Sequence, residues 1–489
     1  AETGLVSVSL PGVEILWDQA FWNCPNLKNV ELGTGLVEMY ADTFGDCVSL
    51  EEFIFPDGSI IETIEAGVFN NCTSLERVVL PQSIKAINSS AFRNCSSLVE
   101  INIPASCTNI NFTAFMGCTS LTNLTLEEGN EAFVKENGVL YNATKTTVIY
   151  VFPEVTGTYE LPEDLTTIAA GAFTGSQISE FVLPATVTEI PDSFFVGISA
   201  DTVVIPQGVE RIGKYAFAYS KIKSIVIPAS VSLVDEYAFQ GCADLETVTF
   251  VESNTRLYLG SSSFEGCTSL EEITIPYRVR LADELTKSTY AVGAGAFRSC
   301  VNLKTVTIEE TPAENGVSGV INFGSNAFYE CSSLTRIDFP AALGNASYRS
   351  GSSTYTCYAV NSSAFQGCTA LETVTFNEVE GQAITLYGSS MFDGCTSLRN
   401  IVLPSTLTGL YFRMFAETAI EEITIPASVK AIGSNAFSGC SALADVTVSW
   451  KEPISINENV FAESMRETLH VPSGAQSAYQ QAVGWKDFE

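Results

Sequence analysis

The chain has 489 residues, of which 46% are hydrophobic and 16% charged, a composition too apolar for a disordered protein. Its formal net charge of -32 repels nucleic-acid phosphates, which argues against a nucleic-acid partner. The single histidine, His470, excludes zinc sites built from several histidines and leaves one place for a histidine-based catalytic pair. Because no stretch approaches the roughly 18 apolar residues of a membrane helix, we expect no membrane insertion within this chain.

One unit recurs along the chain, marked by a phenylalanine that usually follows an alanine. Its spacing is 22 to 25 residues, widened to 58 after Phe115 and to 27–37 between Phe264 and Phe392. A fixed period of this kind is typical of stacked repeat proteins. The 17 copies are centred on Phe21, Phe44, Phe69, Phe92, Phe115, Phe173, Phe195, Phe217, Phe239, Phe264, Phe297, Phe328, Phe365, Phe392, Phe415, Phe437 and Phe461.

Residues 84–104, IKAINSSAFRNCSSLVEINIP, represent the unit. Leu98, Ile101 and Ile103 end in the alternation of a short strand, whereas Ala91, Phe92 and Cys95 fit one face of a single helical turn. One such unit buries too little apolar surface to offset the ordering of its backbone, so the units must stack. The sequence therefore predicts about 18 short parallel strands in one ladder, the first of them at Leu5 to Leu10.

The two regions that depart from this repeat are an insertion and the C-terminus. Alternating apolar runs around Asn137-Gly138 predict a β-meander inserted at about 127–160. We expect the repeat array to cover 1–465, with enlarged insertions at 277–388, and the last strand and a cap to cover 466–489. In the cap, Ser473 is expected to begin a short helix that Gly484 ends, with Tyr479, Ala482 and Trp485 on one face.

Twelve of the 14 cysteines stand three residues after the repeat phenylalanine. Where another residue replaces this cysteine and the unit ends in proline, the following segment is one residue shorter. The pattern favours a buried free thiol that fills one turn geometry, although disulfides between stacked neighbours remain an alternative. Cys107 and Cys357 lie outside the pattern.

The segments AFRNCSSLVEINIP and AFSGCSALADVTV resemble the BspA-type, or Treponema-type, leucine-rich repeat of surface proteins from Bacteroides-like bacteria. The resemblance implies a leucine-rich repeat solenoid, a β-rich α/β superhelix, and it carries over no catalytic residue. It also implies a secreted or cell-surface protein that mediates adhesion, as members that bind fibronectin or fibrinogen do. We expect an outer-membrane anchor upstream of residue 1. The long insertions at 277–388 depart from the family pattern, so the resemblance does not identify a ligand for this chain.

The widened repeats suggest a ligand-binding patch. Their extra residues all enter after a strand and before the next Ala-Phe, so stacking should align them along one rim. Segment 347–358, SYRSGSSTYTCY, has the tyrosine, serine and glycine composition that antibody paratopes use. Alternatively, the tyrosines cover the insertions' own small cores. The candidate binding residues are Arg256, Tyr258, Tyr277, Arg278, Arg280, Tyr290, Tyr348, Arg349, Tyr355, Tyr358 and Tyr387.

The sequence thus predicts a noncatalytic interaction protein with no cofactor and no metal. The expected partner is a host extracellular protein or another cell's surface, and the alternative is a glycan bound by a carbohydrate-binding accessory protein. The threonine and valine column of the strands is either a structural face or a broad adhesive surface. An enzyme whose carboxylates meet across a cleft is the remaining reading, and the recurrence of paired glutamates with the repeat argues against it.

Overall fold

The computed structural model describes residues 4–111, 113–169, 172–173, 176–281, 290–310, 319–350, 353–379 and 383–488. The chain forms two compact units. The first contains Ala1–Thr186, Ser193–Val204 and Ser220–Ile222, and the second contains Val187–Asp192, Ile205–Tyr219 and Lys223–Glu489. The predicted solenoid of stacked parallel strands is confirmed, with about 19 turns.

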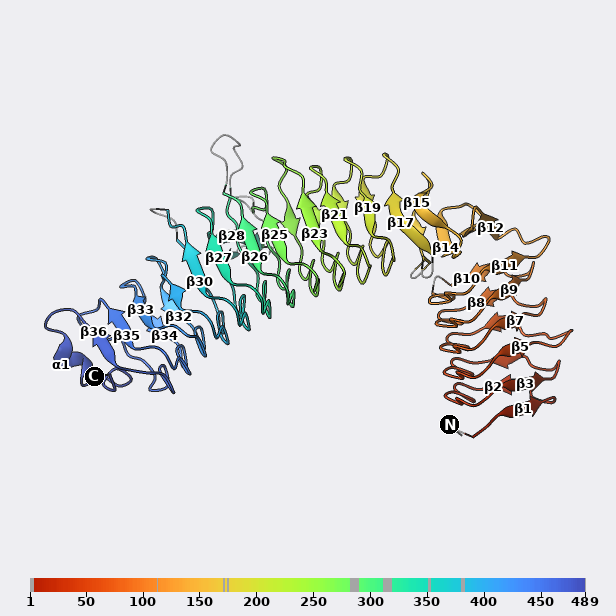
Figure 1. Cartoon of the computed structure of the whole chain (residues 1–489), viewed down its shortest axis with the longest axis horizontal. Coiled ribbons are helices and arrows are strands. Elements are labelled where there is room, and N and C mark those ends of the chain that lie inside the picture. Colours follow the sequence, from red (N-terminus) through yellow and green to blue (C-terminus); the bar gives the residue numbers. More distant parts are fainter. Residues whose placement is uncertain are drawn as a thin grey trace. The chain divides into compact units, whose positions relative to one another are not determined.

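In the first unit, each turn contributes a longer strand to a main ladder and a two-residue strand to a second ladder (Figure 1). The main ladder comprises β1 (Ser7–Leu10), β3 (Asn29–Leu32), β5 (Glu52–Ile54), β7 (Arg77–Val79), β9 (Glu100–Ile103), β11 (Asn123–Leu126), β15 (Thr156–Glu160), β17 (Gln177–Val182) and β19 (Thr202–Val204), with its pairing interrupted between β3 and β5 and between β11 and β15. The second ladder comprises β2 (Ile15–Leu16), β4 (Glu38–Met39), β6 (Thr63–Ile64), β8 (Ala86–Ile87), β10 (Asn109–Ile110) and β16 (Thr167–Ile168).

The second unit repeats this arrangement, and its main strands follow one another in chain order in Figure 1. Its main strands are β21 (Ser224–Ile227), β23 (Thr247–Phe250), β25 (Glu272–Ile275), β26 (Thr305–Ile308), β27 (Arg336–Phe339), β30 (Thr373–Phe376), β31 (Asn400–Ile401), β33 (Glu422–Ile425), β35 (Asp445–Val448) and β36 (Thr468–His470). The pairing of these strands is interrupted between β23 and β25 and between β31 and β33. Its second ladder comprises β18 (Glu189–Ile190), β20 (Arg211–Ile212), β22 (Leu233–Val234), β24 (Tyr258–Leu259), β32 (Gly409–Leu410) and β34 (Ala431–Ile432).

The core lies between the two ladders because alternate strand residues point inward. In β25, for example, Ile273 and Ile275 are buried while Glu272 and Thr274 are exposed. The repeat phenylalanines stack in a column beneath the strands. Phe92 lies between Phe69 and Phe115, with ring centroids 5.3 and 5.6 Å away and rings nearly parallel.

The segment around the repeat phenylalanine is a tight turn, so the predicted helical turn is wrong. Ser90 and Asn94 have φ of 55° and 60°, in the left-handed region that interrupts a helix. As a result the backbone faces the neighbouring turn: the Phe92 amide donates to the Ala114 carbonyl at 2.9 Å and the Asn94 amide to the Met116 carbonyl at 2.7 Å. These bonds form a third stack of inter-turn contacts and explain why the solenoid has almost no helix.

All 14 cysteines are free and buried, as the buried-thiol interpretation predicts. The Cys95 thiol donates to the carbonyl of Phe69 in the preceding turn at 3.1 Å, and Cys118 repeats the contact with Phe92 at 3.1 Å. Where threonine replaces cysteine, the Thr418 hydroxyl instead donates to the Phe415 carbonyl of its own turn at 2.9 Å. This change of hydrogen-bond acceptor occurs in a repeat whose segment between the phenylalanine and the closing proline is one residue shorter than in the repeats with cysteine.

These thiols predict a loss of stability at alkaline pH. Burial raises the pKa of Cys118 and Cys300 to about 12, above the value of about 8.5 for an unfolded thiol. Because the pKa is raised in the folded state, the buried protonated thiol contributes its full stabilisation below about pH 8.5, and this contribution is lost as the pH rises toward 12. Each such thiol is expected to lower the free energy of unfolding by up to about 1.4 kcal/mol per pH unit in this window, measured by urea denaturation.

Tyrosine and lysine side chains also titrate in part of this window, so the control is Cys300→Ala, which should flatten the pH dependence by about one proton. Stability that does not change between about pH 8 and pH 10 would contradict the prediction. Thiol titration of the denatured, unreduced protein should find all 14 groups, and a smaller number would reveal disulfides.

The expected β-meander is present. β12 (Phe133–Glu136), β13 (Val139–Asn142) and β14 (Thr147–Val151) pair antiparallel in sequence order, with the turn at Asn137-Gly138. A parallel pairing of β14 with β16 then joins the meander to the second ladder. In the widened repeats, β28 (Ala346–Ser350) and β29 (Ser353–Cys357) form a further antiparallel hairpin.

The C-terminal cap has less helix than the sequence predicts. Its helix, α1 (Gln476–Tyr479), is one turn long, and its N-cap is Ala475 without a side-chain hydrogen bond, so the assignment of Ser473 as cap is wrong. Tyr479 and Trp485 are buried against each other, with ring centroids 5.6 Å apart. In the described part of the chain, no helix has the length and apolarity needed to cross a bilayer.

Candidate interaction surface

Two of the predicted binding residues are buried inside the solenoid. Arg278 and Arg280 are both 0% exposed, so their expected position on an exposed rim is wrong. The Arg278 guanidinium donates through Nη1 to the Val231 carbonyl at 2.8 Å and through Nη2 to the Pro228 carbonyl at 3.1 Å. Burial lowers the pKa of Arg278. This side chain closes a neighbouring backbone turn and is not available to a ligand at the surface.

The residues beside these arginines also serve the insertion's own packing. Arg280 donates to the carbonyls of Val279 and Glu309 at 2.9 and 3.1 Å, and burial lowers its pKa to about 10. Tyr277 is 8% exposed, and its hydroxyl donates to Asn254 at 3.1 Å. Tyr277, Arg278 and Arg280 are thus buried and bonded to other parts of the same chain.

Two other predicted residues, Tyr358 and Tyr387, come together with Tyr411 in the second unit, and we call this cluster the tyrosine row. The Tyr358 and Tyr387 rings stack with centroids 4.0 Å apart, and Tyr411 meets Tyr387 edge-on at 5.2 Å. Tyr387 is 41% exposed, while Tyr358 and Tyr411 are half-buried. Burial and the nearby hydroxyls of Tyr387 and Tyr358 raise the pKa of Tyr411.

Sequence reasoning missed Tyr411 because it lies in a repeat of ordinary length. It directly follows β32, and Tyr387 directly follows Leu386, which bridges to Val360 in the second ladder. The sequence signal that could have identified Tyr387 and Tyr411 was therefore their position directly after a segment of the second ladder. Next to Tyr411, Phe412 is 46% exposed and extends the aromatic surface.

The other predicted residues are not part of the row. The Tyr290 hydroxyl donates to Asn361 at 3.4 Å, which places it beside the turn that carries Tyr358. Arg256 and Tyr258 are half-buried, and among the described contacts neither touches the row. The side chains of Tyr348, Arg349 and Tyr355 lie outside the part of the chain that the structure describes.

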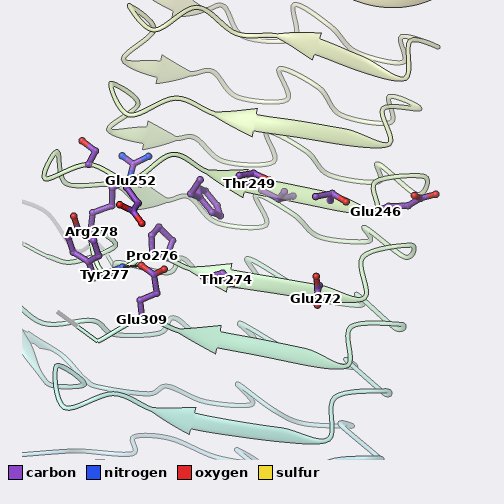
Figure 2. Close-up of a pocket in the computed structure, with 13 residues that line it drawn as sticks. Glu246, Thr249, Glu252, Glu272, Thr274, Pro276, Tyr277, Arg278 and Glu309 are labelled. Carbon is purple, nitrogen blue, oxygen red and sulfur yellow. Dashed lines mark hydrogen bonds between the residues drawn. The ribbon is translucent and has the colours of Figure 1, made fainter. Parts of the chain in front are cut away.

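A pocket of about 240 Å³ opens on the strand face between β23 and β25 (Figure 2). These two strands belong to consecutive turns but are not hydrogen-bonded to each other, since one sheet ends at β23 and the next begins at β25. The walls are acidic and hydroxylic with an apolar end. The lining residues are Glu246, Thr247, Val248, Thr249, Phe250, Glu252, Ser253, Glu272, Thr274, Pro276, Tyr277, Arg278 and Glu309.

Metal-ligating side chains do not cluster in either region, as far as the structure describes them. Over the described residues, no group of three or more histidine, cysteine, aspartate or glutamate side chains is placed to hold a metal ion. His470 Nε2 lies 2.9 Å from Asp445 Oδ1 on the strand face, and both side chains are about half exposed, at 55% and 45%.

Comparisons with known proteins identify the family. The model described as BspA type leucine rich repeat region, with six copies, matches residues 1–122, 166–284, 253–353, 282–378 and 358–483. Among solved structures, a leucine rich cell surface protein from Faecalibacterium prausnitzii is 23% identical over 64% of this chain and 80% of that chain, with a TM-score of 0.44. A leucine-rich repeat protein from Bacteroides ovatus is 22% identical over 91% and 87%, with a TM-score of 0.38. The pneumococcal vaccine antigen PcpA is 20% identical over 71% and 89%, with a TM-score of 0.43. A search of the curated proteins gave no match. Since the family model covers most of its residues, this chain belongs to the BspA-type leucine-rich repeat family.

Proposed function

We propose that this chain is a noncatalytic extracellular interaction protein whose second unit contacts a partner protein through the tyrosine row. The partner class is a host extracellular protein or the surface of another cell. The observation that carries the proposal is the contact of Tyr358, Tyr387 and Tyr411 across successive turns, with Tyr387 and the adjacent Phe412 open to solvent.

Several physical arguments support this assignment. Tyrosine is enriched at the centres of protein interfaces because it combines a large apolar area with a hydroxyl and loses little conformational entropy. A solenoid also holds such side chains on a rigid framework, so little ordering energy is lost on binding. Membership in the leucine-rich repeat family favours an interaction role over catalysis.

The test measures binding of the purified chain to immobilised fibronectin and fibrinogen at low and physiological salt. For a bound protein, the double variant Tyr387→Ala with Tyr411→Ala is expected to weaken binding at least tenfold, since each lost aromatic contact at a hot spot costs about 1 to 2 kcal/mol. The matched control is Tyr219→Asn, which removes a tyrosine that is 62% exposed in the same unit and should leave binding unchanged.

Equal binding by the double variant and the wild type would contradict the assignment. A carbohydrate ligand is the second candidate, favoured by the two phenol hydroxyls at the edges of the stacked Tyr358 and Tyr387 rings. A glycan panel run beside the proteins separates the candidates: binding to glycans alone, lost in the double variant, would replace the protein partner by a carbohydrate.

A further inference from the structure

We propose that the ion pair between Arg413 and Asp393 positions the tyrosine row for binding, because it holds two turns of the second unit together where both ladders are interrupted. This assignment rests on the function proposed above, and it adds the residues on which the geometry of that site depends. In the described hydrogen bonds and ring contacts, neither residue touches the three tyrosines, so the pair acts on the row through the backbone.

The interruption lies between the turns centred on Phe392 and Phe415. On the strand face, one sheet ends at β31 and the next begins at β33. In the second ladder, single bridges continue from Leu259 as far as Leu386, and a separate two-stranded sheet then begins at β32. In the described part of the second unit, only this junction between consecutive turns lacks strand pairing in both ladders.

Among the described residues, the third stack is the remaining backbone connection at this junction. The Phe392 amide donates to the Met414 carbonyl at 2.9 Å and the Gly394 amide to the Ala416 carbonyl at 3.0 Å. Turns that are bonded along one edge can pivot about that edge and separate at the other two. Contacts of exposed residues that also cross the junction contribute little, because water competes for their bonds. These residues are Glu378, Arg399, Ser405, Thr406 and Glu421.

The ion pair is the buried side-chain link across the junction. Asp393 is 7% exposed, and Arg413 donates to its two oxygens through Nε and Nη2 at 2.9 and 2.8 Å, which fixes the relative orientation of both groups. Arg413 has a φ of 52°, in the left-handed region where a long side chain is strained. The equivalent residues of the adjacent turns are the smaller Ser390 and Asn435. An arginine kept in a strained conformation at this junction indicates that its bond to Asp393 has a specific role.

The tyrosine row crosses the same junction on the side of the second ladder. Tyr387 belongs to the turn centred on Phe392 and Tyr411 to the turn centred on Phe415, and their ring centroids are 5.2 Å apart. When the turns separate, this distance grows, and a partner that contacts both rings binds only the closed molecules. Its affinity falls in proportion to the closed fraction, which the ion pair keeps high.

The first experiment is hydrogen exchange on the whole chain without a ligand, comparing the wild type with Asp393→Asn. Asparagine has the shape of the carboxylate, and Arg413 keeps its bond to Glu417 at 2.8 Å, so the variant should fold. The Phe392 amide should exchange at least tenfold faster in the variant. The Phe365 amide, which donates across the preceding junction at 3.0 Å, should change less than twofold. A general loss of stability would instead raise both rates.

The matched control is Asp235→Asn. Asp235 accepts from Arg211 Nε and Nη2 at 3.2 and 2.8 Å across the turns centred on Phe217 and Phe239, where both ladders are paired. Because paired strands hold these turns together without the side chains, exchange of the Phe217 amide should change less than twofold. Equal acceleration at the two junctions, or no acceleration in Asp393→Asn, would overturn the proposal.

The second measurement is binding to immobilised fibronectin and fibrinogen. For a protein bound through the row, Asp393→Asn should raise the Kd about tenfold although all three tyrosines are intact, and Asp235→Asn should leave it unchanged. Faster exchange with unchanged binding would refute the positioning role. Absence of binding by either protein would count against the function of the row, whereas the exchange rates support or contradict the role of the ion pair at the junction by themselves.

Discussion

Replacing Phe92 by alanine is expected to lower the free energy of unfolding of the first unit by about 3 to 5 kcal/mol. The side chain is fully buried and has an aromatic neighbour on each side, Phe69 and Phe115. Neither neighbour can fill the space, because hydrogen bonds between successive turns hold its backbone in place, such as the bond from the Phe69 amide to the Ala91 carbonyl of the next turn. The cavity therefore persists, and both stacking contacts are lost.

The measurement is urea denaturation followed by circular dichroism, with hydrogen exchange to locate the destabilised turns. In a stacked array each turn contacts only its neighbours, so protection should fall first in the turns centred on Phe69, Phe92 and Phe115. The control is Phe21→Ala. Phe21 is half-buried and stacks on one side against Phe44 at 5.2 Å, so its loss should be clearly smaller. Equal losses at the two positions would refute the role of two-sided stacking.

Much of the fold could be predicted because equivalent residues recur at the same positions relative to the repeat phenylalanine. The alternation at Ile101 and Ile103 identified the strand, and the fixed distance from Phe92 to Cys95 identified a buried thiol. The helical turn was predicted wrongly, because apolar spacing does not reveal the left-handed residues Ser90 and Asn94. Serine and asparagine occur in many loops, and only their recurrence two residues before and after the phenylalanine carries the signal.

The candidate site was less predictable for a different reason. Arginine in an insertion was taken as exposed because charged side chains are rarely fully buried. Arg278 and Arg280 nevertheless alternate with Val279 and Leu281 in a run that is buried throughout. The pocket depends on the missing pairing between β23 and β25, which is a property of the register between turns. The residue types within one turn do not indicate the register between neighbouring turns.

Replacing Arg278 by methionine is expected to destabilise the second unit by about 2 to 4 kcal/mol, although methionine has a similar length and no desolvation cost. The guanidinium is held by backbone carbonyls, those of Val231 at 2.8 Å and Pro228 at 3.1 Å, and a thioether cannot donate to either. The buried Val231 carbonyl is left without a donor, at a cost of about 1 to 3 kcal/mol, and the Pro228 carbonyl keeps only the Val231 amide, so the loss exceeds the gain from removing one buried charge.

Lysine should rescue only part of this loss. Its single ammonium is a point charge on a flexible stem, whereas the planar guanidinium donates to both carbonyls at once. The order of stability, measured by urea denaturation, is therefore expected to be wild type, then Arg278→Lys, then Arg278→Met. Hydrogen exchange should locate the change at the Val231 amide, which donates to the Pro228 carbonyl at 3.2 Å within the turn that Arg278 closes.

The control is Arg399→Met, which removes an arginine whose side chain is 63% exposed and pairs with Glu421 at 3.6 Å. Exposed ion pairs contribute about 0 to 1 kcal/mol, so this variant should differ little from the wild type. If Arg278→Met were no less stable than the control, the carbonyls of the 228–231 turn would have to find other donors. The arginine would then be a space-filling residue of the insertion. The expected difference instead means that Arg278 links the insertion to the turns before it through hydrogen bonds. This structural role accounts for a cation inside the solenoid, whereas the carboxylates of the adjacent pocket face solvent.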